Sequence, residues 1–106
     1  MIVRGDVPVG VQLAQAIHAA GSSAQQAGAC SASPPTIAIA LAASPTELAA
    51  LAQRLAGACV PHVLVHEPDP PWRGALMAIG VVPSPRARVR RLVAHLSLVR
   101  GKDDPP

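Results

Sequence analysis

Two stretches of the chain carry side chains that can move protons. His18 lies in an Ala- and Gln-rich stretch that also holds Gln15 and that follows Asp6. Farther along, an apolar run ends in Glu67, and Asp69 comes two residues later. A carboxylate beside an imidazole orients and charges the ring, which suits the pair for general acid–base catalysis. The alternatives are a packed histidine on an Ala-rich helix and two acids that are simply solvated in a loop.

Three helices are expected to position these residues. The clearest spans residues 45–57: Ser44 is an N-cap, Pro45 the first helical residue and Glu47 the partner of a capping box. Its apolar face is formed by Leu48, Leu51, Ala52 and Leu55.

The other two helices are predicted from the spacing of their apolar residues and, for the last of them, from a proline at its start. A helix over residues 11–27 has Leu13, Ala14, Ile17 and Ala20 or Gly21 at helical spacing, with its glutamines elsewhere. A third helix starts at Ser84, its expected N-cap, and Pro85, and its apolar side holds Val89, Leu92, Val93 and Leu96.

Strands are predicted at residues 2–5, 36–42, 63–66 and 75–82, separated by loops rich in Pro and Gly. The order β-α-β-α-β-β-α predicts an α/β fold, a small mixed four-stranded sheet with helices on both faces. The two crossovers imply parallel strand pairs, and the short loop at 68–74 implies an antiparallel pair. Ligands of α/β sheets bind at the carboxyl ends of strands, where Asp6 and Glu67 both stand.

Composition excludes several classes of protein. The 106 residues fit one domain, over 1–100, followed by a polar tail at 101–106. No apolar run is long enough to span a bilayer, and the first residues do not resemble a signal peptide, so we expect a cytoplasmic protein. Cys30 and Cys59 give no disulfide framework, and no metal or cofactor is expected; a metal on His62 and His66 would need ligands from elsewhere.

Aromatic and basic residues bear on nucleic-acid binding. The chain has one Trp, no Tyr and no Phe, which leaves little for base stacking beyond Trp72. Trp72 either stacks on a ligand or covers apolar surface. Basic residues instead gather near the end of the chain, where they form a patch that can meet phosphate or serve as a solvated helix face: Arg86, Arg88, Arg90, Arg91, Arg100 and Lys102. The first four fall outside the apolar arc of the third helix.

Several segments, taken in order, resemble the type 2 peptidyl-tRNA hydrolase family. The most specific piece is the run Leu-Ala-Gln-Ala-Ile-His-Ala-Ala at 13–20, preceded by Val-Arg-Gly-Asp at 3–6. The resemblance continues through residues 45–57, Pro-His-Val-Leu-Val at 61–65, Ala-Leu-Met-Ala-Ile-Gly at 75–80 and Ala-His-Leu-Ser-Leu at 94–98. The chain therefore looks like a short, divergent, bacterial-type member of that family.

The resemblance implies hydrolysis of the ester that joins a peptide to the tRNA 3′ end. It implies catalytic roles for His18, Glu67 and Asp69, a substrate pocket shaped by Asp6 and Gln15, tRNA contacts by Arg86, Arg88, Arg90 and Arg91, and a homodimer. Gln12 and Arg73 are added to the pocket as residues that could compensate for family residues missing here. The turn at 8–12 lacks the family's lysines, and Ala75 stands where the family has threonine. Two alternatives remain: an inactive module that binds RNA or protein on the same fold, and a hydrolase of another ester or amide.

Overall fold

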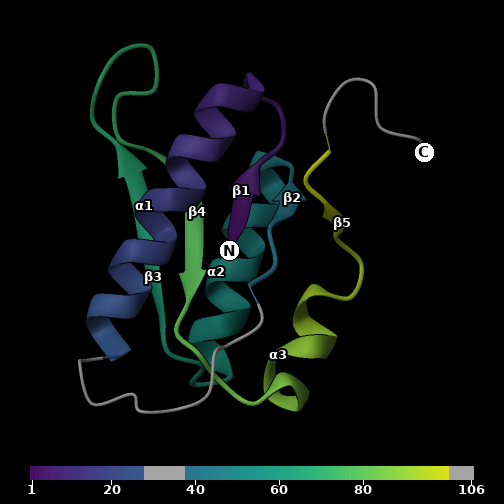
Figure 1. Ribbon diagram of the computed structural model, residues 1–106. Helices are drawn as coiled ribbons and strands as arrows, with labels where there is room; N and C mark the ends of the chain where they lie inside the picture. The colour runs from purple at the N-terminus through teal and green to yellow at the C-terminus, as the bar shows by residue number, and fades with distance from the viewer. Residues whose placement is uncertain (28–37, 101–106) are drawn as a thin grey trace.

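The computed structural model describes residues 1–27 and 38–100. Five strands and three helices make up this part of the chain (Figure 1). They are β1 (Ile2–Arg4), α1 (Val9–Ala27), β2 (Leu41–Ala43), α2 (Pro45–Gly57), β3 (His62–Glu67), β4 (Ala75–Val81), α3 (Arg86–Val93) and β5 (Ser97–Leu98). None of the described helices is long and apolar enough to cross a membrane.

The sheet is mixed, as predicted, but it has five strands in the order β3-β4-β1-β2-β5. β1 and β2 are parallel, while β3 with β4, β4 with β1, and β2 with β5 are antiparallel. The prediction of four strands was wrong because β5 is only two residues long, too short for any alternating pattern. The second crossover, through α2, also yields no parallel neighbour, since it passes over two strands and places β3 at the far edge.

Large aliphatic side chains fill one face of the sheet, beneath α2 and α3. Leu48, Leu51 and Leu55 of α2 are fully buried against Ile2 and Ile79. The capping box starts α2 as predicted, with Glu47 N donating to Ser44 Oγ and Ser44 N donating to Glu47 Oε1. This face is the main hydrophobic core.

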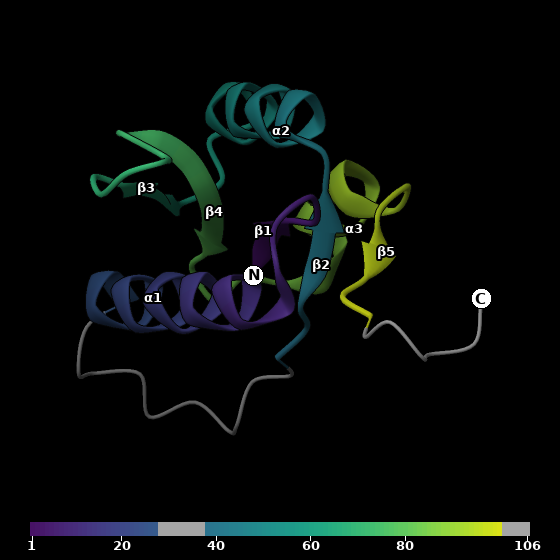
Figure 2. The same cartoon turned by 90° about the horizontal axis from the view of Figure 1, so that it is seen from above.

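The opposite face is covered by α1 (Figure 2), with its inward side made of small and polar residues. Gln12, Gln15, Ala19 and Ser23 are buried there, whereas Leu13 and Ile17 are exposed. The apolar spacing in this helix therefore marks its outer side. The helix lies close to the sheet because Gly80 has no side chain: a Cβ at that position would stand 2.3 Å from the carbonyl oxygen of Ala19.

Some element boundaries differ from the prediction. In the predicted strand at 36–42, residues 36 and 37 lie outside the described residues, and the observed strand begins at Leu41. α3 ends at Val93, so Leu96 packs on the core from beyond the helix. Ser84 does not cap α3, since its hydroxyl donates to the carbonyl of Val82 and leaves Pro85 at the N-cap. The predicted tail at 101–106 lies outside the described residues.

Candidate active site

Two of the predicted site residues meet where α1 crosses the end of β3. Gln15 Nε2 donates to Glu67 Oε2 across 3.0 Å. Alternation along β3 puts Val63, Val65 and Glu67 on the side that faces α1, so the carboxylate comes directly under the helix. The backbone N–H of Asp69 donates to Glu67 Oε1, at 3.2 Å. The Glu67 carboxylate is thus held by a donor on each oxygen.

The Gln15 amide has one polar atom that this arrangement does not satisfy. Gln15 is 4% exposed, and its Oε1 has no hydrogen-bond partner in the described residues. Rotating the amide would not help, because it would turn the oxygen toward the carboxylate of Glu67. Buried polar atoms in proteins are almost always paired, so this oxygen is unusual among the described residues.

His18 follows Gln15 by three residues, which places it on nearly the same side of α1 one turn farther along. Its side chain is exposed, and no hydrogen bond in the described part of the chain joins it to Glu67 or Asp69. Asp69 is itself exposed and contributes to the site through its backbone. The structure therefore brings Gln15 and Glu67 into contact and leaves His18 and the Asp69 carboxylate at the surface nearby.

A second polar group joins the end of β1 to the loop between β3 and β4. Arg4 Nε and Nη2 donate to the two carboxylate oxygens of Asp6, at 2.9 and 2.6 Å. The guanidinium also lies 5.6 Å from the ring centroid of Trp72, within cation–π range. The bonds from Arg4 lower the pKa of Asp6, and those to Asp6 raise the pKa of Arg4.

Sequence reasoning missed Arg4 as a site residue. The signal that could have found it is the Arg-x-Asp spacing, with Arg4 ending β1 and Asp6 in the turn that follows, close enough in sequence to form an ion pair. Trp72 contacts this arginine and is half-buried, so its ring is partly covered by a cation.

Two further predicted pocket residues have other surroundings. Gln12 is buried, and its Nε2 donates to the carbonyls of Val7 at 2.8 Å and Gly5 at 3.4 Å. Its amide therefore braces the turn between β1 and α1. Arg73 is exposed in the loop after Trp72, with a positive φ of 45°.

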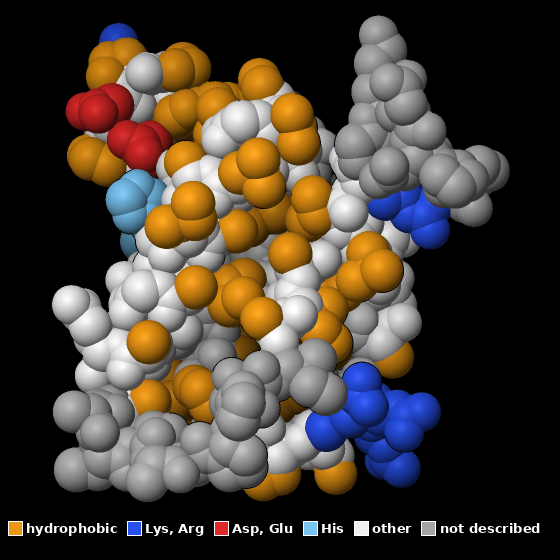
Figure 3. All heavy atoms as spheres, viewed as in Figure 1, with side chains coloured by type: hydrophobic (Ala, Val, Ile, Leu, Met, Phe, Trp, Pro, Cys, Tyr) orange, Lys and Arg blue, Asp and Glu red, His pale blue; other side chains and the backbone are white. Residues whose placement is uncertain are grey.

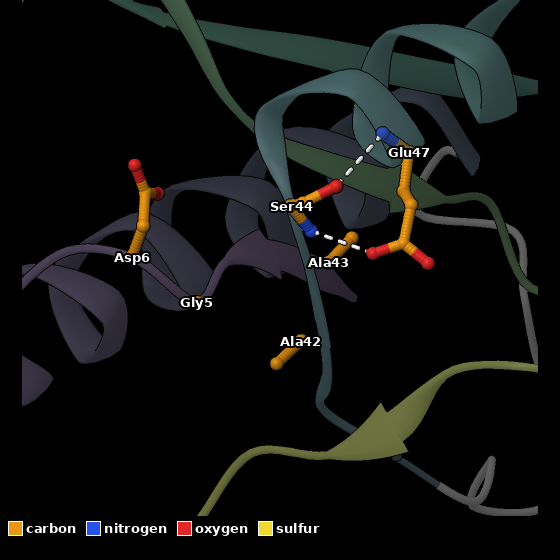
Figure 4. Close-up of a pocket in the computed structure, with 6 residues that line it drawn as sticks. All are labelled: Gly5, Asp6, Ala42, Ala43, Ser44 and Glu47. Atoms are coloured by element: carbon orange, nitrogen blue, oxygen red, sulfur yellow. Dashed lines mark hydrogen bonds between the residues drawn. The ribbon is translucent and has the colours of Figure 1, made fainter.

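A hollow of about 320 Å³ lies elsewhere, at the carboxyl ends of the parallel strands β1 and β2. It is lined by Gly5, Asp6, Ala42, Ala43, Ser44 and Glu47 (Figure 4). Asp6 stands on one side of it, and the capping box of Ser44 and Glu47 on the other. Asp6 is the one predicted site residue in its lining, so the hollow and the Gln15–Glu67 pair are separate features.

The predicted basic surface is present on α3. Arg86, Arg88, Arg90 and Arg91 are all exposed, as their spacing predicts, while Val89, Leu92 and Val93 pack toward the core. Arg88 Nη2 donates to the carbonyl of Cys59. Both views place α3 and the loop between β3 and β4 at opposite ends of the molecule (Figures 1 and 2).

No metal site was predicted, and the described residues hold no group of three His, Cys, Asp or Glu side chains that could bind a metal ion. Cys59 is exposed and unpaired, and Cys30 lies outside the described residues. No protein-family model matches the chain, and no curated protein matches it either.

Proposed function

We propose that the protein hydrolyses the ester between a peptide and the 3′ end of tRNA, with Glu67 as the general base. The observation that carries this proposal is the hydrogen bond between Gln15 and Glu67, together with the bond from the backbone N–H of Asp69 to the same carboxylate. A water that donates a proton to Glu67 would be oriented by a carboxylate whose position these two donors fix. The resemblance to the type 2 peptidyl-tRNA hydrolase family supplies the substrate class.

The reaction needs two proton transfers. Glu67 removes a proton from the water as its oxygen attacks the ester carbonyl carbon and forms a tetrahedral oxyanion. When that intermediate collapses, the carbon–oxygen bond to the terminal ribose breaks and the ribose oxygen takes up a proton. His18, exposed one turn beyond Gln15, is the proposed donor.

The family's lysines before the helix are absent here, so positive charge must come from other residues. Arg73 is the proposed contact for the phosphates near the tRNA 3′ end, because it is exposed in the loop that follows Glu67. Arg4 is less suited to this task, since Asp6 already accepts two of its hydrogen bonds.

The arginines of α3 are the proposed contact for the tRNA backbone. They stand at the other end of the molecule from Glu67, so one tRNA would have to reach across the protein. Replacing Arg86, Arg90 and Arg91 with Gln should weaken tRNA binding equally for all sequences and make it less sensitive to salt. Release of the acyl group should show a raised KM and an unchanged kcat.

The decisive experiment measures release of an N-blocked amino acid from tRNA by the wild type and three variants. Glu67→Gln should lower kcat by about 10²- to 10⁴-fold because it removes the general base. His18→Ala should lower it as well, whereas His95→Ala, an exposed histidine outside the site, should not. No release by the wild type contradicts the proposed activity. Release that survives Glu67→Gln contradicts the assignment of the base.

A second candidate is an RNA-binding module without catalysis. It is favoured by the exposed His18, which has no hydrogen bond to either acid in the described residues, and by the arginines of α3. For this candidate we expect salt-dependent tRNA binding by the wild type, no ester cleavage, and unchanged binding in Glu67→Gln.

A further inference from the structure

The loop between β3 and β4, residues 68–74, is folded around the carbonyl group of Asp69. The backbone N–H groups of Trp72 and Arg73 both donate to this carbonyl, at 3.0 and 3.1 Å. The backbone N–H of Asp69 donates in turn to Glu67 Oε1, at 3.2 Å. One short hydrogen-bonded segment thus joins the indole side chain to a donor that holds the candidate base. The position of Trp72 therefore bears directly on the position of that donor.

Arg4 contacts this loop from the end of β1. Ile2 belongs to the core cluster beneath α2, and Val3 belongs to the cluster beneath α1. Because side chains alternate along a strand, Arg4 falls on the α2 side of the sheet, opposite the side that carries Glu67. Its guanidinium lies 5.6 Å from the ring centroid of Trp72. Contacts with α1 on one face and with β1 on the other therefore hold this end of the β3–β4 hairpin.

Asp6 fixes the direction of the Arg4 side chain. Arg4 Nε and Nη2 donate to the two carboxylate oxygens, at 2.9 and 2.6 Å, and a guanidinium bound through two N–H groups at once has little freedom to turn. The side chain of Arg4 is 16% exposed and that of Asp6 is 44% exposed, so the arginine is the more shielded of the two. A cation over an aromatic ring is attracted more strongly when it is shielded from water. The pair with Asp6 thus presents Arg4 to Trp72 in one orientation.

Arg4 differs in its surroundings from Arg73, the other arginine near this loop. Arg73 is exposed in the loop itself. Acidic, basic and hydrophobic side chains gather at this end of the molecule (upper left in Figure 3). Arg4 is half-buried, and two of its N–H groups are already bound by Asp6. Arg73 is therefore placed to meet a substrate, whereas Arg4 is placed to act on the loop.

We propose that Arg4 is a positioning residue for the candidate base. Paired with Asp6, it holds Trp72 in place. The loop around Trp72 in turn keeps the N–H of Asp69 against the Glu67 carboxylate. The effect on catalysis rests on the proposed hydrolysis, whereas the effect on the loop does not. A carboxylate that loses one of its donors turns more freely and is less often oriented to take a proton from water, so kcat falls.

Exchange of the Asp69 amide hydrogen, followed by NMR, tests the effect on the loop. Arg4→Met keeps a long side chain but removes the charge, and exchange should become about 2- to 10-fold faster, as the loss of one hydrogen bond of ordinary strength gives. Arg4→Lys should keep the slow exchange, because an ammonium group can pair with Asp6 and still lie over the ring. Arg54→Met, at an exposed arginine of α2, is the matched control and should exchange like the wild type. Unchanged exchange in Arg4→Met overturns the proposal.

Release of an N-blocked amino acid from tRNA tests the effect on catalysis. Arg4→Met should lower kcat by about 10- to 10²-fold, as misplacement of a catalytic group does, with little change in KM because other residues are the proposed tRNA contacts. Arg4→Lys should restore most of the loss, and Arg54→Met should behave like the wild type.

A double-mutant cycle shows whether Arg4 acts through Trp72. Trp72→Leu should lower kcat as Arg4→Met does, and combining the two should cause no further loss, because both remove the same contact. A wild-type kcat in Arg4→Met overturns the proposal, as do losses that multiply in the double variant. If the wild type releases nothing, the proposed hydrolysis fails, and amide exchange still decides whether Arg4 holds the loop.

Discussion

The two faces of the sheet are packed by different kinds of side chains. Beneath α2, Leu48, Leu51 and Leu55 are fully buried, and apolar burial of this kind is the main source of stability in a small domain. Beneath α1, small residues and two glutamines are buried, and one amide oxygen is left without a partner in the described residues. The side chains that contribute most to stability and the residues of the candidate site therefore lie on opposite faces of the sheet.

The largest effect should come from the aliphatic face. Leu51→Ala should lower the free energy of unfolding by about 2 to 5 kcal/mol, because it removes a fully buried side chain and leaves a cavity. Urea denaturation measures the change. Ser23→Ala is the matched substitution on the other face, where the Ser23 hydroxyl donates to the carbonyl of Ala20; it should cost less than about 1.5 kcal/mol. Equal costs would contradict the difference between the two faces.

An intermediate effect should come from the contact between Gly80 and Ala19, which allows α1 to lie close to the sheet. Gly80→Ala introduces a methyl group that clashes with the carbonyl of Ala19, and since backbone must move, we expect a loss of about 1 to 3 kcal/mol or more. Hydrogen exchange should show faster exchange in α1 and little change in α2. Gly57→Ala, in open space at the end of α2, is the control; a similar loss there would show that the contact with Ala19 is not the cause.

The smallest effect should come from the ion pair of Arg4 and Asp6, in which the carboxylate is exposed and the arginine is half-buried. Asp6→Asn should cost at most about 1 kcal/mol at neutral pH. Arg4 lowers the pKa of Asp6 in the folded protein, so the stabilisation is complete above the unfolded pKa of about 3.9 and is lost as the pH falls through the folded pKa. Urea midpoints of wild type and variant should therefore converge in acid. A gap that stays constant with pH would mean that Asp6 acts through something other than its charge.

The side of the sheet with strong local signals was predictable. The capping box of α2 marks the start of that helix and its leucines mark the buried side, and the structure agrees. The prolines around β3 and β4 mark the antiparallel pair equally well. Each of these signals involves residues that lie close together in the sequence, so it can be recognised without knowing the fold.

The other side depended on residues far apart in the chain. Spacing showed that Leu13 and Ile17 share a side of α1, but which side meets the sheet is decided by Ala19 against Gly80. The contact of Gln15 with Glu67 likewise needs the order of the strands, and β5 has no pattern of its own. Gln15 and Glu67 could be chosen from the sequence, whereas their hydrogen bond, the exposed His18 and the role of Arg4 could not.

The position of β1 has a consequence for synthesis of the chain. β1 comes first in the sequence but lies inside the sheet, between β4 and β2, and Ile2 is paired with Ile79. At about 5 to 20 residues per second, translation needs between about 4 and 15 s to reach Ile79 after Ile2. During that interval one edge of β1 has no strand to pair with, although both Ile2 and Val3 end up buried. The sheet around β1 therefore cannot be completed before β4 has been synthesised, and slower synthesis of the segment before β4 would lengthen the time that this apolar edge lacks its partner.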